Sequence, residues 1–236
     1  MELLLLHALP LDGSMWDAQK HLLPGATYAP TLYPLGDTIE DWAAAALGMA
    51  KSDRLIVVGC SVGGSCAIEV AALAPERVAA LVLIGTKAAH RPDRVLRDSV
   101  LQVLREKRLE EAWRTLWAPL FSSSATSQAV DLGRRIAVRQ LSRDVARGVK
   151  AFHSRPNRQR VLARFPRPVA VVTGADDIAP GMKISRIQAD SAPRGLLRIV
   201  PNCGHYVPLE QPEALNAILK EVIDLSMSED SSLRSG

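Results

Sequence analysis

One short segment constrains this chain more than any other. Residues 59–64 read Gly-Cys-Ser-Val-Gly-Gly and follow directly on an apolar run, residues 54–58, that predicts a buried strand. The segment fits the pattern Gly-x-Ser-x-Gly, and an Ala-rich helical stretch comes after it. A serine at the tip of so tight a turn needs small residues two positions before and two positions after it, which Gly59 and Gly63 supply. The turn would hold the Ser61 hydroxyl near a helix N-terminus, where negative charge is favoured, so Ser61 is predicted to be a nucleophile.

A serine hydroxyl needs a base to accept its proton, and His205 is the favoured candidate. This residue lies in a loop between the last predicted strand, residues 196–200, and the last predicted helix. His7, at the end of the first strand, competes for the role, but it precedes the loop assigned below to oxyanion binding, and we expect it to be structural. The other three histidines are expected at the surface or in packing contacts: His21, His90 and His153.

A carboxylate must fix the tautomer of the base, and an acidic pair follows the predicted strand at residues 169–173. We favour Asp177 for this role. Asp176 stays an alternative, because sequence does not set the direction of a side chain in a loop. The chain order Ser61, Asp177, His205 is the order expected for a serine elbow on a parallel sheet.

Two backbone N–H groups are needed to bind the oxyanion that forms when a serine attacks a carbonyl. One should belong to the residue after the nucleophile, which is Val62. The other should come from the loop after the first strand, residues 7–10, and we assign it to Leu9.

Strand and helix signals alternate along the chain. Strand signals fall at residues 3–6, 54–58, 78–84, 169–173 and 196–200. Helix signals fall at residues 39–50 (preceded by the capping pattern Thr-Ile-Glu-Asp), 63–74, 182–190 and 212–225. Such alternation predicts an α/β fold with a mostly parallel sheet flanked by helices on both faces, and ligands bind beyond the carboxyl ends of such strands.

The alternation breaks once. Residues 88–164 carry no convincing strand and several amphipathic helices, which predicts a helical cap over one edge of the sheet. Residues 1–87 and 165–225 form the predicted core, and the polar tail, residues 226–236, is predicted to be disordered.

Within the cap, three aromatic residues recur every four positions: Trp113, Trp117 and Phe121. On a helix they would share one apolar face, which favours packing onto the core and is compatible with lining an apolar substrate pocket. The cap is also basic, with 19 Lys and Arg against 7 Asp and Glu over residues 87–167. Because these charges are scattered at helical spacing and no nucleic-acid motif accompanies them, we interpret them as a solvated face and expect no nucleic-acid partner.

Composition excludes several classes of protein. An apolar fraction of 47% and a charged fraction of 23% argue against a disordered chain. No run reaches the length of a membrane span, and the apolar start is too short for a signal peptide and carries Glu2, so we expect a cytoplasmic protein. Cys60, Cys66 and Cys203 fit neither a disulfide framework nor a metal motif, and we expect small buried side chains, no metal and no cofactor.

Five segments carry a resemblance to a known family: residues 5–16, 57–64, 74–78, 174–180 and 203–213. On these segments the chain resembles serine hydrolases of the α/β-hydrolase fold, which implies that Ser61, Asp177 and His205 form a triad and that the cap covers the acyl or alcohol pocket. Three departures stand out: Ala8 replaces a usual Gly, Cys60 replaces a frequent His, and the acidic loop is one residue shorter before Pro180.

The expected activity is therefore hydrolysis of a carboxylic ester without a cofactor, by acyl transfer through Ser61. The expected partner is a small-molecule substrate with an apolar acyl or alcohol part. Lactones, thioesters and activated C–C bonds are alternatives, because the same groups serve them. Two rivals come from other classes: a ligand receptor that keeps the triad but turns over little, and a protein that binds anions through the basic cap. The sequence leaves the oligomeric state open.

Overall fold

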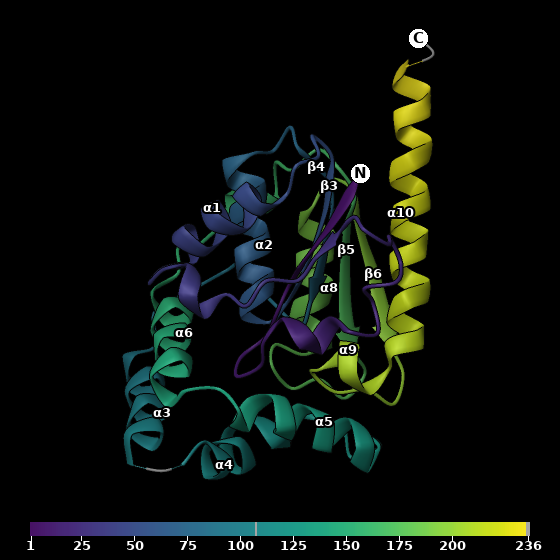
Figure 1. The fold of residues 1–236 in the computed structure, drawn as a ribbon. Helices are drawn as coiled ribbons and strands as arrows, with labels where there is room; N and C mark the ends of the chain where they lie inside the picture. Colours follow the sequence, from purple (N-terminus) through teal and green to yellow (C-terminus); the bar gives the residue numbers. More distant parts are fainter. Residues whose placement is uncertain (107, 235–236) are drawn as a thin grey trace.

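The computed structural model describes residues 1–106 and 108–234, and it contains a six-stranded sheet in the order β2-β1-β3-β4-β5-β6 (Figure 1). Every strand pair is parallel. The strands are β1 (Glu2–Leu6), β2 (Thr27–Tyr28), β3 (Leu55–Cys60), β4 (Val78–Ile84), β5 (Val169–Gly174) and β6 (Gly195–Val200). Five of the six match the predicted strands to within two residues at each end. The prediction missed β2, an edge strand of two residues without an apolar run.

The central strands are apolar throughout because helices cover the sheet. All residues of β3, β4 and β5 are buried, as expected for parallel strands that lie between helical layers. The strand β6 lies at the edge of the sheet, and only its last residue, Val200, is buried. The predicted fold class, a parallel sheet flanked by helices, is confirmed.

Helices of the core pack directly on the strands. Helix α1 (Ile39–Met49) begins with the predicted capping box, in which the Thr38 and Asp41 side chains each accept a hydrogen bond from the other residue's backbone N–H. Helix α2 (Val62–Leu73) packs on β3 and β4, and α8 (Met182–Ser191) packs on β5 and β6. Short helical turns complete the core: η1 (Gly13–Trp16), η2 (Tyr33–Leu35) and α9 (Val207–Glu210).

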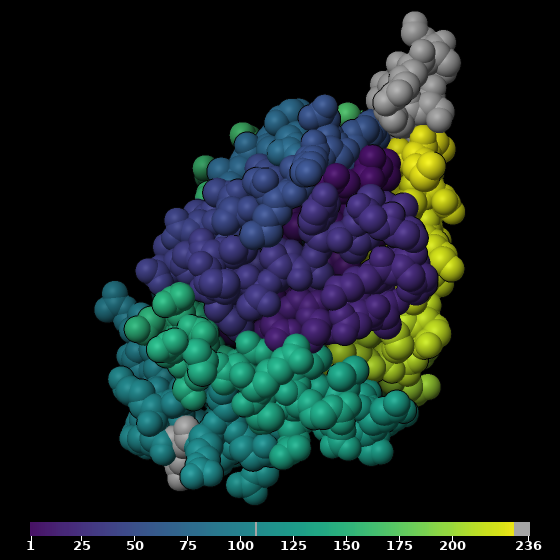
Figure 2. All heavy atoms as spheres, viewed as in Figure 1, coloured from purple at the N-terminus to yellow at the C-terminus, as the bar shows by residue number. Residues whose placement is uncertain are grey.

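Between β4 and β5 the described residues form helices and no strand. These helices are α3 (Arg94–Glu106), α4 (Leu109–Ala112), α5 (Ser127–Val138), α6 (Ser142–Ser154) and α7 (Gln159–Leu162), with a π-helical turn η3 (Trp113–Trp117) and a 3-10 turn η4 (Ala118–Leu120). Helices α3, α4, α5 and α6 lie at the end of the sheet where the strands finish (Figure 1), whereas α7 packs on α2. We call residues 88–164 the cap. Figure 2 shows the cap, in teal and green, against the N-terminal segment in purple.

The C-terminal helix differs from its prediction. Helix α10 (Pro212–Arg234) continues nine residues past the expected end, so residues 226–234 are helical where a disordered tail was predicted. Ser226 is fully buried within it, and its hydroxyl donates to the Val222 carbonyl at 2.7 Å. Residues 235–236, the rest of the predicted tail, lie outside the described residues. Among the helices that the structure describes, α10 included, none has the length and apolarity needed to cross a membrane.

Candidate active site

Ser61 lies at the junction of β3 and α2, in a backbone conformation that few residues other than glycine adopt. Its φ is 54° and its ψ is −116°. The turn is held by a hydrogen bond from the Ser61 N–H to the Ile84 carbonyl, 2.8 Å long. A Cβ atom on Gly59 would lie 2.2 Å from the Gly63 carbonyl oxygen, and one on Gly63 would lie 2.1 Å from the Leu6 carbonyl oxygen. The two glycines are therefore required by the close approach of backbone to backbone, as the motif predicts.

His205 and Asp177 are brought together from two different loops. The His205 Nδ1–H donates to the Asp177 carboxylate, with 3.1 Å to Oδ1 and 3.3 Å to Oδ2. Both side chains are almost completely buried. Asp176 instead accepts a hydrogen bond from the Ser122 hydroxyl at 2.5 Å. Of the two candidate acids, the structure places Asp177 beside the histidine.

Gly85 is a residue of this site that the sequence analysis missed. It follows β4 with a φ of 54°, and a Cβ atom there would lie 2.8 Å from His205 Nδ1 and 3.1 Å from Asp177 Oδ2. The imidazole and the carboxylate therefore occupy the space that any other residue would need. A glycine directly after a predicted strand was the available signal.

Glu210 is a second missed residue, and it holds the loop that carries the histidine. Its buried carboxylate accepts three backbone hydrogen bonds: from Gly204 at 2.8 Å, from Tyr206 at 2.9 Å and from Ser122 of the cap at 2.9 Å. The N–H of His205 donates to a cap carbonyl, that of Leu120, at 2.9 Å. The position of the imidazole thus depends on both the core and the cap.

The loop after β1 leaves one N–H group available near Ser61. Leu9 lines the same cavity as Ser61, and within the described residues neither the Leu9 N–H nor the Val62 N–H donates to a protein acceptor. The neighbouring Ala8 N–H, in contrast, points at the Met15 sulfur at 3.2 Å. The Tyr206 hydroxyl donates to the Leu9 carbonyl at 3.0 Å, which links this loop to the histidine loop. The two predicted oxyanion donors are therefore free to bind a ligand.

His7 is held in a structural role at the start of that loop. Its Nε2 accepts a hydrogen bond from the Leu32 N–H at 2.8 Å, and its Nδ1 contacts the Ala8 carbonyl at 3.0 Å. Burial lowers the pKa of His7 to about 4, so the ring is neutral and both nitrogens are occupied. Ala8, the departure from the usual glycine, is not among the residues with a positive φ, and alanine therefore fits without strain.

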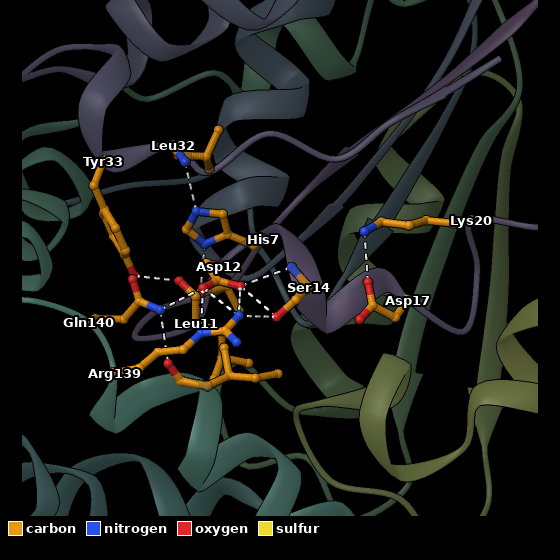
Figure 3. A network of polar contacts seen from close by, with 12 residues as sticks. His7, Leu11, Asp12, Ser14, Asp17, Lys20, Leu32, Tyr33, Arg139 and Gln140 are labelled. Carbon is orange, nitrogen blue, oxygen red and sulfur yellow. Dashed lines mark hydrogen bonds and ion pairs between the residues drawn. The ribbon is translucent and has the colours of Figure 1, made fainter. Parts of the chain in front are cut away.

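A polar network fastens the far end of the same loop to the cap (Figure 3). The Asp12 carboxylate accepts hydrogen bonds from Arg139 at 2.8 Å and from Gln140 at 2.6 Å, both at the end of α5. It also accepts from Ser14 at 2.9 Å within its own turn. Although partial burial alone would raise the pKa of Asp12, these hydrogen bonds lower it below the usual value. The loop that carries Leu9 is therefore tied to the cap by an ionised carboxylate.

A cavity of about 530 Å³ lies between the core and the cap, and both Ser61 and His205 line it. Leu9 and Tyr206 contribute further walls from the core, and Trp117 contributes one from the cap. This volume is within the range of small-molecule sites. Ser61, His205 and Leu9, singled out from separate parts of the sequence, thus line one cavity.

The cap does not form the single aromatic face that the sequence predicted. Residues Trp113–Trp117 form a π-helical turn, a 3-10 turn follows, and Phe121 is extended, so the spacing of four does not produce one stripe. Trp117 lines the cavity, but Trp113 and Phe121 do not. These two pack on each other, 5.7 Å between ring centroids, and on Tyr206. The pocket assignment is therefore wrong for Trp113 and Phe121, which support the histidine loop from behind.

His90 and His153, expected at the surface or in packing contacts, both line the cavity. The Nε2 of His90 contacts the His153 carbonyl at 3.0 Å. Arg155 lines the same wall. His90 precedes α3, whereas His153 and Arg155 lie at the end of α6. No local pattern in the sequence therefore linked all three to the site.

The three cysteines are buried and unpaired. Burial raises the pKa of each thiol, so Cys60 beside the serine stays protonated and is no competing nucleophile. In the part of the chain that the structure describes, no group of three or more His, Cys, Asp or Glu side chains could hold a metal ion.

The chain is similar to known proteins in both sequence and structure. The chain is 26% identical over 260 residues to a pimeloyl-(acyl-carrier protein) methyl ester esterase of Aromatoleum aromaticum, covering 94% of this chain and 98% of that protein. Its structure is similar to that of a thermophilic esterase from Thermogutta terrifontis, with a TM-score of 0.83 and 25% identity over 96% of this chain and 90% of the other. It shares its fold with the enol-lactonase of Burkholderia xenovorans, with a TM-score of 0.82 and 19% identity over 94% of this chain and 90% of the other. The alpha/beta hydrolase family matches residues 3–218, most of the length, and this chain belongs to that family.

Proposed function

We propose that this protein is a serine hydrolase that cleaves a carboxylic ester through an acyl-enzyme, with Ser61, His205 and Asp177 as its triad. One observation carries the proposal: His205, bonded through Nδ1 to the buried Asp177 carboxylate, lines the same cavity as Ser61 at the tip of its strained turn. Because Nδ1 is occupied by Asp177, the free Nε2 is the atom that can accept a proton from the serine. The esterases among the similar proteins support the choice of an ester.

Acylation follows from these positions. Ser61 Oγ forms a bond to the ester carbonyl carbon while His205 Nε2 takes the hydroxyl proton. The carbonyl oxygen gains the negative charge, and the Leu9 and Val62 N–H groups stabilise it. The tetrahedral intermediate then collapses, the ester C–O bond breaks, and His205 returns the proton to the leaving alkoxide. Asp177 stabilises the imidazolium that exists between these two proton transfers.

Deacylation repeats the sequence with water. His205 takes a proton from water as the oxygen bonds to the acyl carbon, and the same N–H groups stabilise the second oxyanion. Collapse of this intermediate breaks the bond to Ser61 Oγ, and the proton passes back to the serine. The products are a carboxylic acid and an alcohol, and the enzyme is regenerated.

The test is hydrolysis of p-nitrophenyl esters from acetate to laurate by wild type, Ser61→Ala and Ser65→Ala. Loss of the nucleophile should lower kcat by about 10³-fold or more. The matched control, Ser65→Ala, removes another hydroxyl near the start of α2 and should retain activity, because this buried hydroxyl has no hydrogen-bond partner among the described residues. Many turnovers per molecule are expected, which separates an enzyme from a receptor that is acylated once. A folded wild type that hydrolyses none of the esters contradicts the proposal for an ester substrate.

A further inference from the structure

The cavity wall contains a buried arginine without an acidic partner. Arg155 follows α6 directly and is 6% exposed. Its guanidinium stacks on the Phe152 ring, 3.8 Å from the centroid, and donates one hydrogen bond to the Phe152 carbonyl. In the described part of the chain no carboxylate pairs with it. A buried cation that lacks a counter-charge is uncommon, because removal from water must be offset by a partner.

A neighbouring arginine shows the ordinary arrangement. Arg158, three residues further along, donates to both oxygens of the buried Glu69 carboxylate at 2.6 and 2.7 Å. The fold therefore provides a buried carboxylate for the partly exposed guanidinium of Arg158 and none for the more deeply buried guanidinium of Arg155. Burial lowers the pKa of Arg155 to about 10, which still leaves it charged at neutral pH.

The rest of this wall does not neutralise the charge. Lys87 and Arg91 also line the cavity, and the only carboxylate among its described lining residues is that of Asp93. One oxygen of Asp93 accepts from the Leu96 N–H and caps helix α3. Burial, and next the positive charge of Arg155, lower the pKa values of both His90 and His153, which favours their neutral forms. An imidazole carries no negative charge in either protonation state, so neither ring can balance the charge of Arg155.

A purely structural role for Arg155 would leave most of its N–H donors unused. A guanidinium has five N–H donors in a planar fork, and its contact with Phe152 occupies one of them. Within the described residues the other four have no protein acceptor. Such a fork matches the two oxygens of a carboxylate, and the charge of one carboxylate equals the charge of one guanidinium.

We propose that Arg155 forms a subsite for a carboxylate carried by the substrate, so that the ester cleaved at Ser61 is anionic, such as the half-ester of a dicarboxylic acid. The apolar side chains of Val100, Leu116 and Leu120 line the same cavity and suit a hydrocarbon segment between the carboxylate and the ester. The proposal rests on the proposed function for the identity of the bond, but the binding of the carboxylate can be tested without turnover.

The kinetic test compares p-nitrophenyl half-esters of dicarboxylic acids, from succinate to suberate, with p-nitrophenyl esters of monocarboxylic acids of equal chain length. The leaving group is the same in each pair, so the ratio of kcat/KM reports the carboxylate. Wild type should favour the half-ester at least tenfold at one chain length. Arg155→Gln should lower that ratio at least tenfold, and Arg155→Lys should lower it less, because it keeps the charge but not the fork. The matched control is Arg160→Gln, an exposed arginine of the same cap outside the cavity, which should keep the wild-type ratio.

The binding test uses Ser61→Ala and calorimetry with free glutarate, adipate and suberate against hexanoate, with butylphosphonate as a second anion. A dicarboxylate should bind at least tenfold tighter than hexanoate, and Arg155→Gln in the same background should abolish the difference. Tighter binding of the phosphonate than of every dicarboxylate would overturn the assignment to a carboxylate.

The two proposals fail in different ways. Binding of dicarboxylates that depends on Arg155, without hydrolysis of any ester, would support the subsite and contradict the esterase. Hydrolysis of neutral esters, with no preference for half-esters and no binding of dicarboxylates, would overturn the subsite and leave the esterase standing. If Arg155→Gln fails to fold, the preference of wild type and its partial loss in Arg155→Lys decide the question.

Discussion

At the scale of single residues, the neighbours Asp176 and Asp177 make different contacts. Asp177 holds His205 Nδ1, whereas Asp176 accepts from Ser122 of the cap. Asp177→Asn presents an amide that donates to the imidazole and favours the wrong tautomer, so it should lower kcat by about 10³ to 10⁴-fold. Asp176→Asn keeps an acceptor for Ser122 and should retain most of the activity. The measurement is kcat on one p-nitrophenyl ester, with circular dichroism to show that both variants fold; the reverse ranking would contradict this assignment.

The sequence alone favoured Asp177 over Asp176 but could not exclude Asp176. The spacing of the motifs along the chain predicted Ser61 and His205 as catalytic candidates, because both follow predicted strands in a recognisable pattern. The choice between Asp176 and Asp177 depends on side-chain direction in a loop, which is set by the contact with Ser122, 54 positions away in sequence.

His7 predicts a dependence of stability on pH. Burial lowers its pKa to about 4, against about 6.5 in an unfolded chain. The unfolded state therefore binds the proton first, and the free energy of unfolding falls as the pH drops from about 6.5 to about 4. The loss from this one group should be about 2 kcal/mol between pH 7.5 and pH 5.

Urea unfolding of wild type and His7→Asn at pH 7.5 and pH 5 measures this effect. The variant lacks the titrating ring, so its stability should change less between the two values of pH. His21→Asn, at an exposed histidine, should keep the wild-type difference. Equal pH dependence in wild type and His7→Asn would show that His7 is not the group responsible.

At the scale of elements, the backbone segments of the strand–turn–helix unit around Ser61 lie so close together that the turn has no room for a side chain at Gly63. A Cβ atom on Gly63 would lie 2.1 Å from the Leu6 carbonyl oxygen, so Gly63→Ala must push α2 away from β1. The expected cost is about 3 kcal/mol or more of unfolding free energy, together with loss of activity. Gly48→Ala is the matched control, because nothing lies within 4 Å of the added atom in α1, and it should stabilise by about 0.5–1 kcal/mol. The denaturation midpoints of the two variants measure the difference in stability. A Gly63→Ala variant with the stability and activity of wild type would contradict the steric account of the turn.

The elements of the core were easier to predict than those of the cap. Strands buried on both faces are continuous apolar runs, which the sequence displays directly. In the cap, the expected aromatic stripe assumed one regular helix, whereas the chain changes from a π turn to a 3-10 turn to an extended residue between Trp113 and Phe121. Residues 226–236 were predicted to be disordered because they are polar, but helix α10 continues to Arg234. No Pro or Gly interrupts residues 226–234, and extending an existing helix costs little.

At the scale of the whole molecule, the candidate site exists only where the core and the cap meet. Core loops contribute Ser61, Leu9 and His205, and the cap contributes Trp117 and Arg155. These residues are separated by up to 196 positions, from 9 to 205. A local pattern in the sequence cannot show which distant residues meet in space. The sequence therefore predicted candidate catalytic residues but not the residues of the cap that line the cavity opposite them.

The ion pair between Asp12 and Arg139 attaches the cap to the loop that carries Leu9, the predicted oxyanion donor (Figure 3). Arg139→Ala removes the charged partner of Asp12 and should lower the stability by about 1 kcal/mol, because Arg139 itself is half exposed. It should also lower kcat/KM by about tenfold by loosening the loop that carries Leu9. Arg135→Ala, at an exposed arginine on the same helix, should change neither quantity. Thermal unfolding and ester kinetics test both effects. A wild-type kcat/KM in Arg139→Ala would show that activity does not depend on the contact between the cap and this loop.

The identity of the nucleophile is tested most directly by mass spectrometry of the intact protein after reaction with a fluorophosphonate. The account predicts one adduct per molecule, mapped to Ser61 by peptide sequencing, with loss of fluoride. The adduct should be absent in Ser61→Ala and should form more slowly in Asp177→Asn, because His205 then accepts the serine proton less well. A folded wild type that forms no adduct, or forms it on another residue, would contradict the account.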